Sequence, residues 1–302
     1  MAISPNKDTS EFIPKYIKKC EFCGCSNFAI FQTKDTYNII KCNNCGLICL
    51  DYDLSSEHLH NIYAEQYFKN ENGTWKTRGY PNYFTMEDAL RKTFRKRIKN
   101  ILKIIPGGNL LDIGCGPGFF LDEAKKYFNV KGVEISKFAS SYAKNNLNIN
   151  IINKPFDLCD FKTDAFNVVT MWDAIEHLIH PKDDINEIYR ILKPDGLIVI
   201  QTGDIESLFR KLTGKRWHLY NVPEHLYFFS KNILLNLLIE SKFAIKKVSY
   251  DWSFYSVAHI FDRLIRIFLP SKGYAKQDSF LSHILMPVNL FDIVTIYAIK
   301  RN

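Results

Sequence analysis

The sequence predicts an α/β fold in which a doubly wound, mostly parallel sheet follows a small cysteine-rich unit. Two observations lead to this prediction. Six of the eight cysteines lie within residues 20–49, and residues 109–128 read as an apolar strand, a glycine-dense turn and a helix. A strand that enters a helix through glycines is typical of nucleotide-binding sheets. We expect four segments: an N-terminal tail (1–18), a zinc ribbon (19–50), a tyrosine-rich connector (51–85) and one large α/β domain (86–302).

The bulk composition fits a globular chain with one main core. Its 302 residues include 46% hydrophobic and 14% aromatic side chains, enough to bury a core without a partner. The formal charge of +8 suits an anionic partner such as a nucleotide sugar, a phosphoglycan or RNA, but so modest an excess does not choose between them.

The first residues lack the continuous apolar run of a secretory signal. No later stretch approaches the roughly 18 uncharged apolar residues of a membrane span. We therefore expect a cytoplasmic protein. In that compartment the cysteines are thiols or metal ligands rather than disulfides.

The N-terminal cysteines form two paired knuckles. Cys20 with Cys23 and Cys42 with Cys45 are CxxC pairs, each followed directly by a glycine. This spacing matches a tetrahedral zinc site, and the glycines let the backbone turn tightly beneath the sulfurs. Four protein ligands close the coordination sphere, so we expect a structural ion, with Cys25 as an alternative ligand. A redox CxxC is less favoured, because thioredoxin-like pairs occur singly.

An amphipathic helix precedes the first strand of the large domain. Apolar side chains recur at helical intervals between residues 86 and 105, among many Lys and Arg, and Pro106 ends the helix. The strand 109–113 and the helix 119–128 follow, joined by the glycine turn.

The glycine turn differs from that of dinucleotide-binding enzymes. Gly114, Gly116 and Gly118 follow an acid in a GxGxG pattern rather than GxGxxG. A cofactor without a phosphate needs close backbone approach and an acid for its ammonium group, and Asp112 is placed for that. The next strand ends at Glu134, whose carboxylate can accept both ribose hydroxyls.

Four motifs in order resemble those of the class I S-adenosylmethionine-dependent methyltransferases. They are LDIGCGPGFFL, GVEIS, FNVVTMWDAIEHL and RILKPDGLIVI. The resemblance spans residues 86–302 and implies a seven-stranded sheet of order 3-2-1-4-5-7-6, with strand 7 antiparallel and S-adenosylmethionine as the cofactor. It places the methionine end of the cofactor against Asp112 and the three glycines, and the ribose against Glu134.

The same resemblance implies contacts at the two ends of the cofactor. Asp160, in the loop after strand 3, would meet the adenine amino group, with Asp157 as the alternative. Met171 and Trp172, at the end of strand 4, would form the wall near the sulfonium.

A glutamate followed by a histidine occurs twice near the expected methyl group. Glu176-His177 follows strand 4, and Glu224-His225 lies in a later loop before a helix that Ser230 would cap. Histidine titrates near neutral pH and can take a hydroxyl proton while a carboxylate fixes its tautomer. We predict His225 as the general base, with Glu224 and His177 beside it.

The His225 segment, the zinc ribbon and the connector together resemble deoxysugar C-methyltransferases and bacterial polysaccharide-cluster methyltransferases. This resemblance implies that the Glu-His pair acts at a sugar, with Tyr80 or Tyr83 nearby. The C-methyltransferases have a further C-terminal domain that this sequence does not match. We therefore expect O-methylation of a sugar hydroxyl on a nucleotide sugar or polysaccharide.

Two alternatives involve metal and RNA. Asp173, Glu176, His177 and His225 resemble the divalent-metal cluster of small-RNA 2'-O-methyltransferases, which holds Mg²⁺; helix capping is the simpler interpretation. A zinc ribbon before this domain also resembles rRNA guanine methyltransferases, and the basic helix 91–103 could follow phosphates. The second half has no Asn-Pro-Pro-aromatic signature, so nucleic acid is the less favoured acceptor. An inactive interaction protein is disfavoured, because the cofactor motifs are intact.

Residues 243–250 and 291–299 read as strands 6 and 7, with 252–290 as a helical insertion between them. The insertion is rich in large apolar side chains. We expect helices that cover the core or form a lid, with a membrane-surface helix as the alternative.

Overall fold

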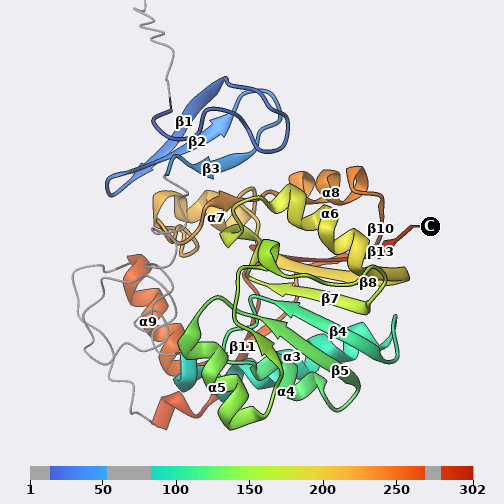
Figure 1. Ribbon diagram of the computed structural model, residues 1–302. Coiled ribbons are helices and arrows are strands. Elements are labelled where there is room, and N and C mark those ends of the chain that lie inside the picture. Colours follow the sequence, from blue (N-terminus) through green and yellow to red (C-terminus); the bar gives the residue numbers. More distant parts are fainter. Residues whose placement is uncertain (1–13, 53–82, 269–279, 302) are drawn as a thin grey trace, which may run out of the picture.

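The computed structural model of the protein describes residues 14–52, 83–268 and 280–301 (Figure 1). A seven-stranded sheet forms its centre, and its strand order is β10-β13-β8-β7-β4-β5-β6. Numbered along the domain, this order is the predicted 3-2-1-4-5-7-6, and β13 is antiparallel to both of its neighbours. The strands are β4 (Gly108–Ile113), β5 (Phe128–Val133), β6 (Ile151–Ile152), β7 (Phe166–Trp172), β8 (Leu192–Gly203), β10 (Phe243–Ser249) and β13 (Ile293–Lys300).

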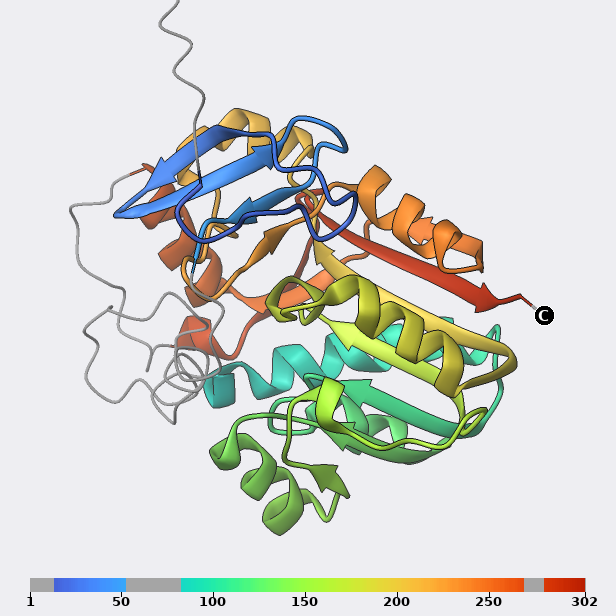
Figure 2. The ribbon, with the colours of Figure 1, turned by 45° about the horizontal axis from the view of Figure 1, so that its top comes forward.

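Helices cover both faces of the sheet (Figure 2). Along β7 the side chains alternate: Val168 and Trp172 join the core beneath α3 and α4, whereas Val169 and Met171 join the core beneath α6 and α8. Alternation of this kind is what a strand buried on both faces requires. The helices of the first face are α3 (Glu87–Leu102), α4 (Phe119–Ala124) and α5 (Lys137–Leu147); those of the second are α6 (Pro181–Ile191) and α8 (Lys231–Glu240).

Serine hydroxyls cap the N-termini of two of these helices. Ser136 accepts a hydrogen bond from the Ala139 amide at the start of α5. Ser230 accepts one from the Ile233 amide at the start of α8, as the sequence predicts. The Ser230 cap fixes where the chain leaves the loop that contains His225.

The N-terminal ribbon (residues 14–52) is an antiparallel sheet that the large domain completes. Its strands are β1 (Phe28–Lys34), β2 (Tyr37–Cys42) and β3 (Ile48–Leu50). The fourth strand, β9 (Tyr227–Phe228), belongs to the large domain and pairs with β3. Residues 15–17, predicted as part of a tail, donate their three backbone N–H groups to the Asp51 carboxylate. The ribbon is therefore docked on the large domain by backbone pairing.

The insertion between β10 and β13 contains a helix and a small sheet. Strands β11 (Ser253–Ser256) and β12 (Leu285–Val288) pair antiparallel and flank α9 (Val257–Phe268). The sequence predicts only helices in this insertion, and the structure contains two paired strands as well. The Phe254 amide donates to the Thr93 hydroxyl at 2.8 Å, which holds β11 against α3. Short α7 (Leu208–Thr213) precedes β9, and no helix among the described residues is long and apolar enough to cross a membrane.

Candidate active site

A cavity of about 480 Å³ opens at the carboxyl ends of β4, β5 and β7. Its volume lies in the range that holds a cofactor-sized ligand. In a parallel α/β sheet this edge is where ligands bind. The wall combines residues that the sequence predicts with others from α3, β8 and β11 that it does not: Tyr83, Thr93, Phe94, Arg97, Gly114, Gly116, Glu134, Asp157, Trp172, Asp173, His177, Gln201, Ser253, Phe254 and Tyr255.

The glycine turn forms one side of the cavity through two of its three glycines. Gly114 has φ +71°, and a Cβ built there would lie 2.8 Å from the Cβ of Ala174. Gly116 also lines the cavity, but Gly118 does not. A Cβ at Gly118 would instead meet Ala143 of α5 at 3.0 Å, so this glycine permits the packing of α4 on α5.

Glu134 presents its carboxylate at the cavity while backbone groups hold it in place. The Gly116 and Ser136 amides donate to its two oxygens at 2.8 and 2.7 Å. Burial raises the pKa of this carboxyl, and the amide donors act in the opposite direction. Such fixing suits the predicted role in holding ribose hydroxyls.

Asp112 lies behind the cavity wall rather than in it. Its side chain is 2% exposed and accepts a hydrogen bond from the Thr170 hydroxyl at 2.6 Å. Burial raises the pKa of Asp112 to about 8. Asp112 does not line the cavity, and its direct contact with a cofactor ammonium stays a prediction.

Of the two residues predicted to meet the adenine, Asp157 and Asp160, only one lines the cavity. Asp157 belongs to the wall, next to Phe156, whereas Asp160 is exposed outside it. At the other end, Trp172 lines the cavity, and Met171 is fully buried on the opposite face of β7. The structure thus brings Asp157 and Trp172 to the cavity and leaves Asp160 and Met171 away from it.

Two histidines meet at the substrate side of the cavity. His177 lines it, and the His225 ring packs edge-on behind His177 with their centroids 4.8 Å apart. The Nδ1–H of His177 donates to the backbone carbonyl of Glu224 at 2.7 Å, which leaves the lone pair on Nε2. Burial lowers the pKa of His177 to about 4 and lowers that of His225 well below its ordinary value. Both shifts favour the neutral ring.

A carboxyl group completes a three-residue cluster with these histidines. Glu176, His177 and His225 each bring a ligand atom within 4.8 Å of the others. Oε2 of Glu176 is buried without a hydrogen-bond partner among the described residues. Burial, together with nearby Asp173, raises the pKa of Glu176 to about 8.

Of the two predicted tyrosines, one lies among the residues that the structure describes and the other does not. Tyr83 lines the cavity and stacks on Phe119, with ring centroids 5.8 Å apart. Tyr80 lies outside the described residues.

Sequence reasoning missed Arg97 and the β11 side chains Phe254 and Tyr255, all in the wall. Arg97 lies one turn after Phe94 on the apolar stripe of α3, where a cation is unexpected, and this anomaly was the available signal. The β11 residues lie in an insertion whose pattern points to no site.

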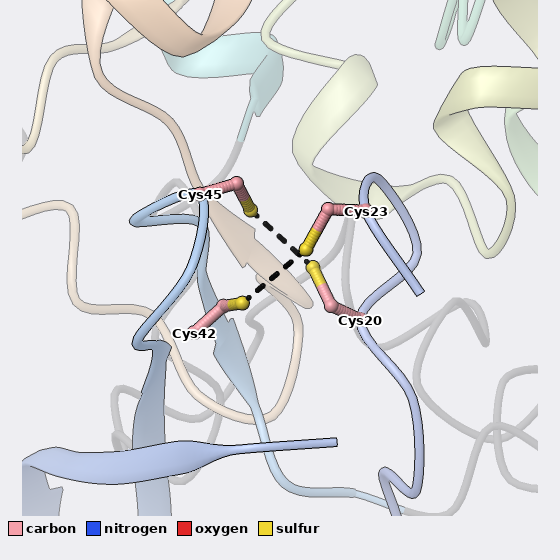
Figure 3. A group of neighbouring side chains, drawn as sticks. All are labelled: Cys20, Cys23, Cys42 and Cys45. Carbon is pink, nitrogen blue, oxygen red and sulfur yellow. Dashed lines mark hydrogen bonds between the residues drawn. The ribbon is translucent and has the colours of Figure 1, made fainter. Parts of the chain in front are cut away.

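The four knuckle cysteines converge on one point (Figure 3). The sulfurs of Cys20 and Cys45, and those of Cys23 and Cys42, are 3.5 Å apart. Zinc–sulfur bonds of about 2.3 Å in a tetrahedron place sulfurs about 3.8 Å apart, so this donor set fits the ion. The amides of the two trailing glycines donate to the carbonyls of Cys20 and Cys42, which closes each knuckle.

Comparison with known proteins gives relatives for the large domain. A family model described as a methyltransferase domain matches residues 86–248. An uncharacterised protein of Methanocaldococcus jannaschii is 31% identical over 54% of this chain and 77% of its own length. The mitochondrial ubiquinone biosynthesis O-methyltransferase of Schizosaccharomyces pombe is 28% identical over 43% of this chain, and the match spans about half of that enzyme (48%).

Solved structures share the fold at low identity. A putative methyltransferase from Bacillus halodurans superposes with a TM-score of 0.51 at 15% identity, over 69% of this chain and 99% of its own. An S-adenosylmethionine-dependent methyltransferase from Archaeoglobus fulgidus gives 0.50 at 19% identity, over 72% and 99%.

Proposed function

This chain belongs to the methyltransferase-domain family and is an S-adenosylmethionine-dependent methyltransferase, and from that premise we propose that it methylates a hydroxyl oxygen with His177 as the proton acceptor. The observation that carries the proposal is the position of His177 in the cavity wall, with Nδ1–H tied to a backbone carbonyl. The predicted base, His225, lies behind it.

The cavity suits the cofactor in its donors and its shape. Gly114 and Gly116 allow close backbone approach, Glu134 would hold the ribose hydroxyls, and Asp157 would meet the adenine amino group, since all four residues line the cavity. Bound S-adenosylmethionine supplies an electrophilic methyl group on a sulfonium. The chain's own part is to hold the acceptor oxygen in line with that methyl and to receive its proton.

Nε2 of His177 is suited to that proton transfer. Its lone pair is set by the Nδ1–H bond to the Glu224 carbonyl, so the backbone of Glu224 supports the base rather than its side chain. His225 packs edge-on against the ring and limits its rotation. A positioned base contributes roughly 10² to 10⁴ in rate.

His177→Asn tests this role, because asparagine can still donate to the Glu224 carbonyl but offers no basic nitrogen. We expect methyl transfer, followed as S-adenosylhomocysteine release, to fall by about a hundredfold or more. The affinity for S-adenosylhomocysteine should remain unchanged. His283→Asn, a change at an exposed histidine, is the control. Parental turnover in His177→Asn would exclude the base.

For the acceptor we propose a sugar hydroxyl on a nucleotide sugar or a glycan. The resemblance of the His225 segment supports it, and the cavity wall includes the aromatic side chains Trp172, Phe254 and Tyr255, a residue type that commonly borders sugars. A phenolic hydroxyl is the second candidate, favoured by the same aromatic wall and by relatives named as ubiquinone biosynthesis O-methyltransferases. Turnover with a panel of nucleotide sugars and catechols separates the two.

RNA is the less favoured acceptor, because the second half of the sequence has no Asn-Pro-Pro-aromatic signature. On the basic helix α3, Arg91 is paired with Glu87 and Asp122 at 2.7 and 2.6 Å, and Arg97 is buried. Neither is available to a phosphate backbone, which requires exposed cations, and the RNA alternative depends on the exposed Lys92, Arg95, Lys96 and Lys99 of the same helix.

We also propose metal roles for both clusters. Zinc at the four cysteines is structural, because four thiolates leave no open position. At the histidines, a divalent ion on Glu176, His177 and His225 is a rival to the general base, supported by the unpartnered Oε2 of Glu176. Loss of turnover in EDTA and its restoration by Mg²⁺ would favour the metal.

A further inference from the structure

One side of the cavity is a loop that has little regular structure of its own. The cavity loop (residues 177–180) lies between β7 and α6, and residues 178–180 belong to no helix or strand. Leu178, Ile179 and His180 all line the cavity, and so does Asp184 in the first turn of α6. Such a segment takes its position from contacts with its neighbours, because it has no ladder of backbone hydrogen bonds.

Two residues of the first cysteine knuckle contact this loop and the helix that follows it. Glu21 and Phe22 lie between the two cysteines of that knuckle. The Lys182 ammonium, in the first turn of α6, donates to the Phe22 carbonyl at 3.1 Å. Nδ1 of His180 lies 3.5 Å from a carboxylate oxygen of Glu21, and the Phe22 ring packs 6.2 Å from that of Phe229. The first knuckle therefore borders the cavity loop and α6 directly.

The four-cysteine site fixes the knuckle residues that make these contacts. The Gly24 amide donates to the Cys20 carbonyl at 2.8 Å and closes the backbone of the knuckle. The two sulfurs of the knuckle belong to the four that converge on one point. An ion bound to all four would hold so short a segment more firmly than backbone bonds alone. The position of the Phe22 carbonyl therefore depends on the metal site, and Lys182 binds that carbonyl.

We propose that Lys182 is a positioning residue that couples the four-cysteine site to the cavity. A metal-loaded knuckle holds Lys182 through the Phe22 carbonyl and so orders the cavity loop, which a ligand in the cavity must also order. Zinc and the cofactor then each bind more tightly when the other is present, and the two effects are equal by linkage. The proposal rests on cofactor binding in this cavity and on zinc at the four cysteines, and it is independent of the acceptor.

Zinc competition measures this coupling. A chelator of known zinc affinity competes for the ion under native conditions, with and without saturating S-adenosylhomocysteine. We expect this ligand to raise the zinc affinity of the parent about fivefold or more, the lower end of couplings between linked sites. By reciprocity, zinc-depleted protein should bind S-adenosylhomocysteine more weakly by the same factor in calorimetry.

Lys182→Met removes the ammonium but keeps an unbranched side chain on α6. Its zinc content should remain about one per chain, because all four cysteines are present. The coupling factor should fall to about twofold, because the contacts of Glu21 and Tyr227 with the loop remain. Lys182→Arg keeps a donor for the Phe22 carbonyl and should retain most of the factor. Lys162→Met, a change at an exposed lysine, is the control and should keep the parental factor.

The coupling factor separates positioning from a purely structural role. A residue that only stabilises the fold would lower the free energy of unfolding in Lys182→Met and leave the factor at its parental value, which would overturn the proposal. Unchanged zinc affinity in a parent that binds S-adenosylhomocysteine would overturn it as well. A parent that binds no S-adenosylhomocysteine would contradict cofactor binding itself, and this proposal with it.

Discussion

At the residue scale, desolvation sets the protonation of the groups around the cavity. Burial raises the pKa of Asp112 to about 8 and that of Glu176 to about 8, and it lowers the pKa of His177 to about 4. Burial therefore favours the uncharged forms of these three groups near neutral pH.

Asp112 should make the free energy of unfolding depend on pH, and the sign of this dependence follows from the raised pKa of Asp112. The protonated carboxyl contributes stability that is complete below the ordinary pKa of 3.8 and is lost as the pH rises through about 8. Asp112→Asn keeps a polar partner for the Thr170 hydroxyl and does not titrate. We expect the parental free energy of unfolding to fall more steeply than that of the variant between about pH 5 and 8, by up to about 1.4 kcal/mol per pH unit.

Urea denaturation at several pH values measures both slopes. Glu176 contributes in the same direction in both proteins, so the difference between them isolates Asp112. Parallel slopes would mean that Asp112 is ionised in the folded protein.

At the element scale, the sequence predicts those parts of the fold that have a local signal. The glycine turn, the strand that ends at Glu134 and the cap at Ser230 each have one. The pairing of β3 with β9 has none, because its partners Ile48 and Phe228 are about 180 residues apart and β9 has only two residues. Strands β11 and β12 are similarly short and lie inside an apolar segment.

The candidate site also contains some residues that a local sequence signal predicts and others that have no such signal. Period-two alternation places Met171 and Trp172 on opposite faces of β7, and of the two only Trp172 lines the cavity. The choice between Asp157 and Asp160 depends on the path of a loop, for which the sequence has no periodic signal. Arg97 was identifiable only as a cation on an apolar helical stripe.

The four-cysteine element gives a metal prediction. We expect about one zinc per chain, and Cys42→Ser should lose the ion and make the N-terminal segment sensitive to protease, because so short a segment cannot support its own core. Cys25→Ser is the matched control: its sulfur accepts the Asn27 amide and is not one of the four converging thiols. Elemental analysis and limited proteolysis give the readout. Full zinc content in Cys42→Ser would rule out this ligand set.

At the scale of the whole molecule, the ribbon and the large domain share one core. Cys20, Phe28 and Leu47 of the ribbon belong to the same buried cluster as Tyr227 and Phe229. A side-chain contact crosses the same boundary, since the Lys182 ammonium donates to the Phe22 carbonyl. Tyr227, which pairs with Cys49 of the ribbon, donates its hydroxyl to the Ile179 carbonyl within the large domain. The ribbon is thus part of the wall that supports the cavity loop 177–180.

This shared core predicts a single cooperative unfolding transition. In urea, zinc release detected with a coloured chelator should coincide with the loss of helical circular dichroism, because neither part can open without exposing the common core. Zinc release well before the loss of helix would show that the ribbon unfolds independently.

The β3–β9 pairing also has a consequence for synthesis of the chain. The ribbon strands leave the ribosome first, but the strand that covers the edge of β3 follows only after most of the central sheet has been made. Until then β3 presents unpaired backbone groups, which are a template for pairing with another chain. The nascent ribbon therefore passes through an interval of aggregation risk, which ends when the Ser230-capped loop closes and β9 occupies that edge.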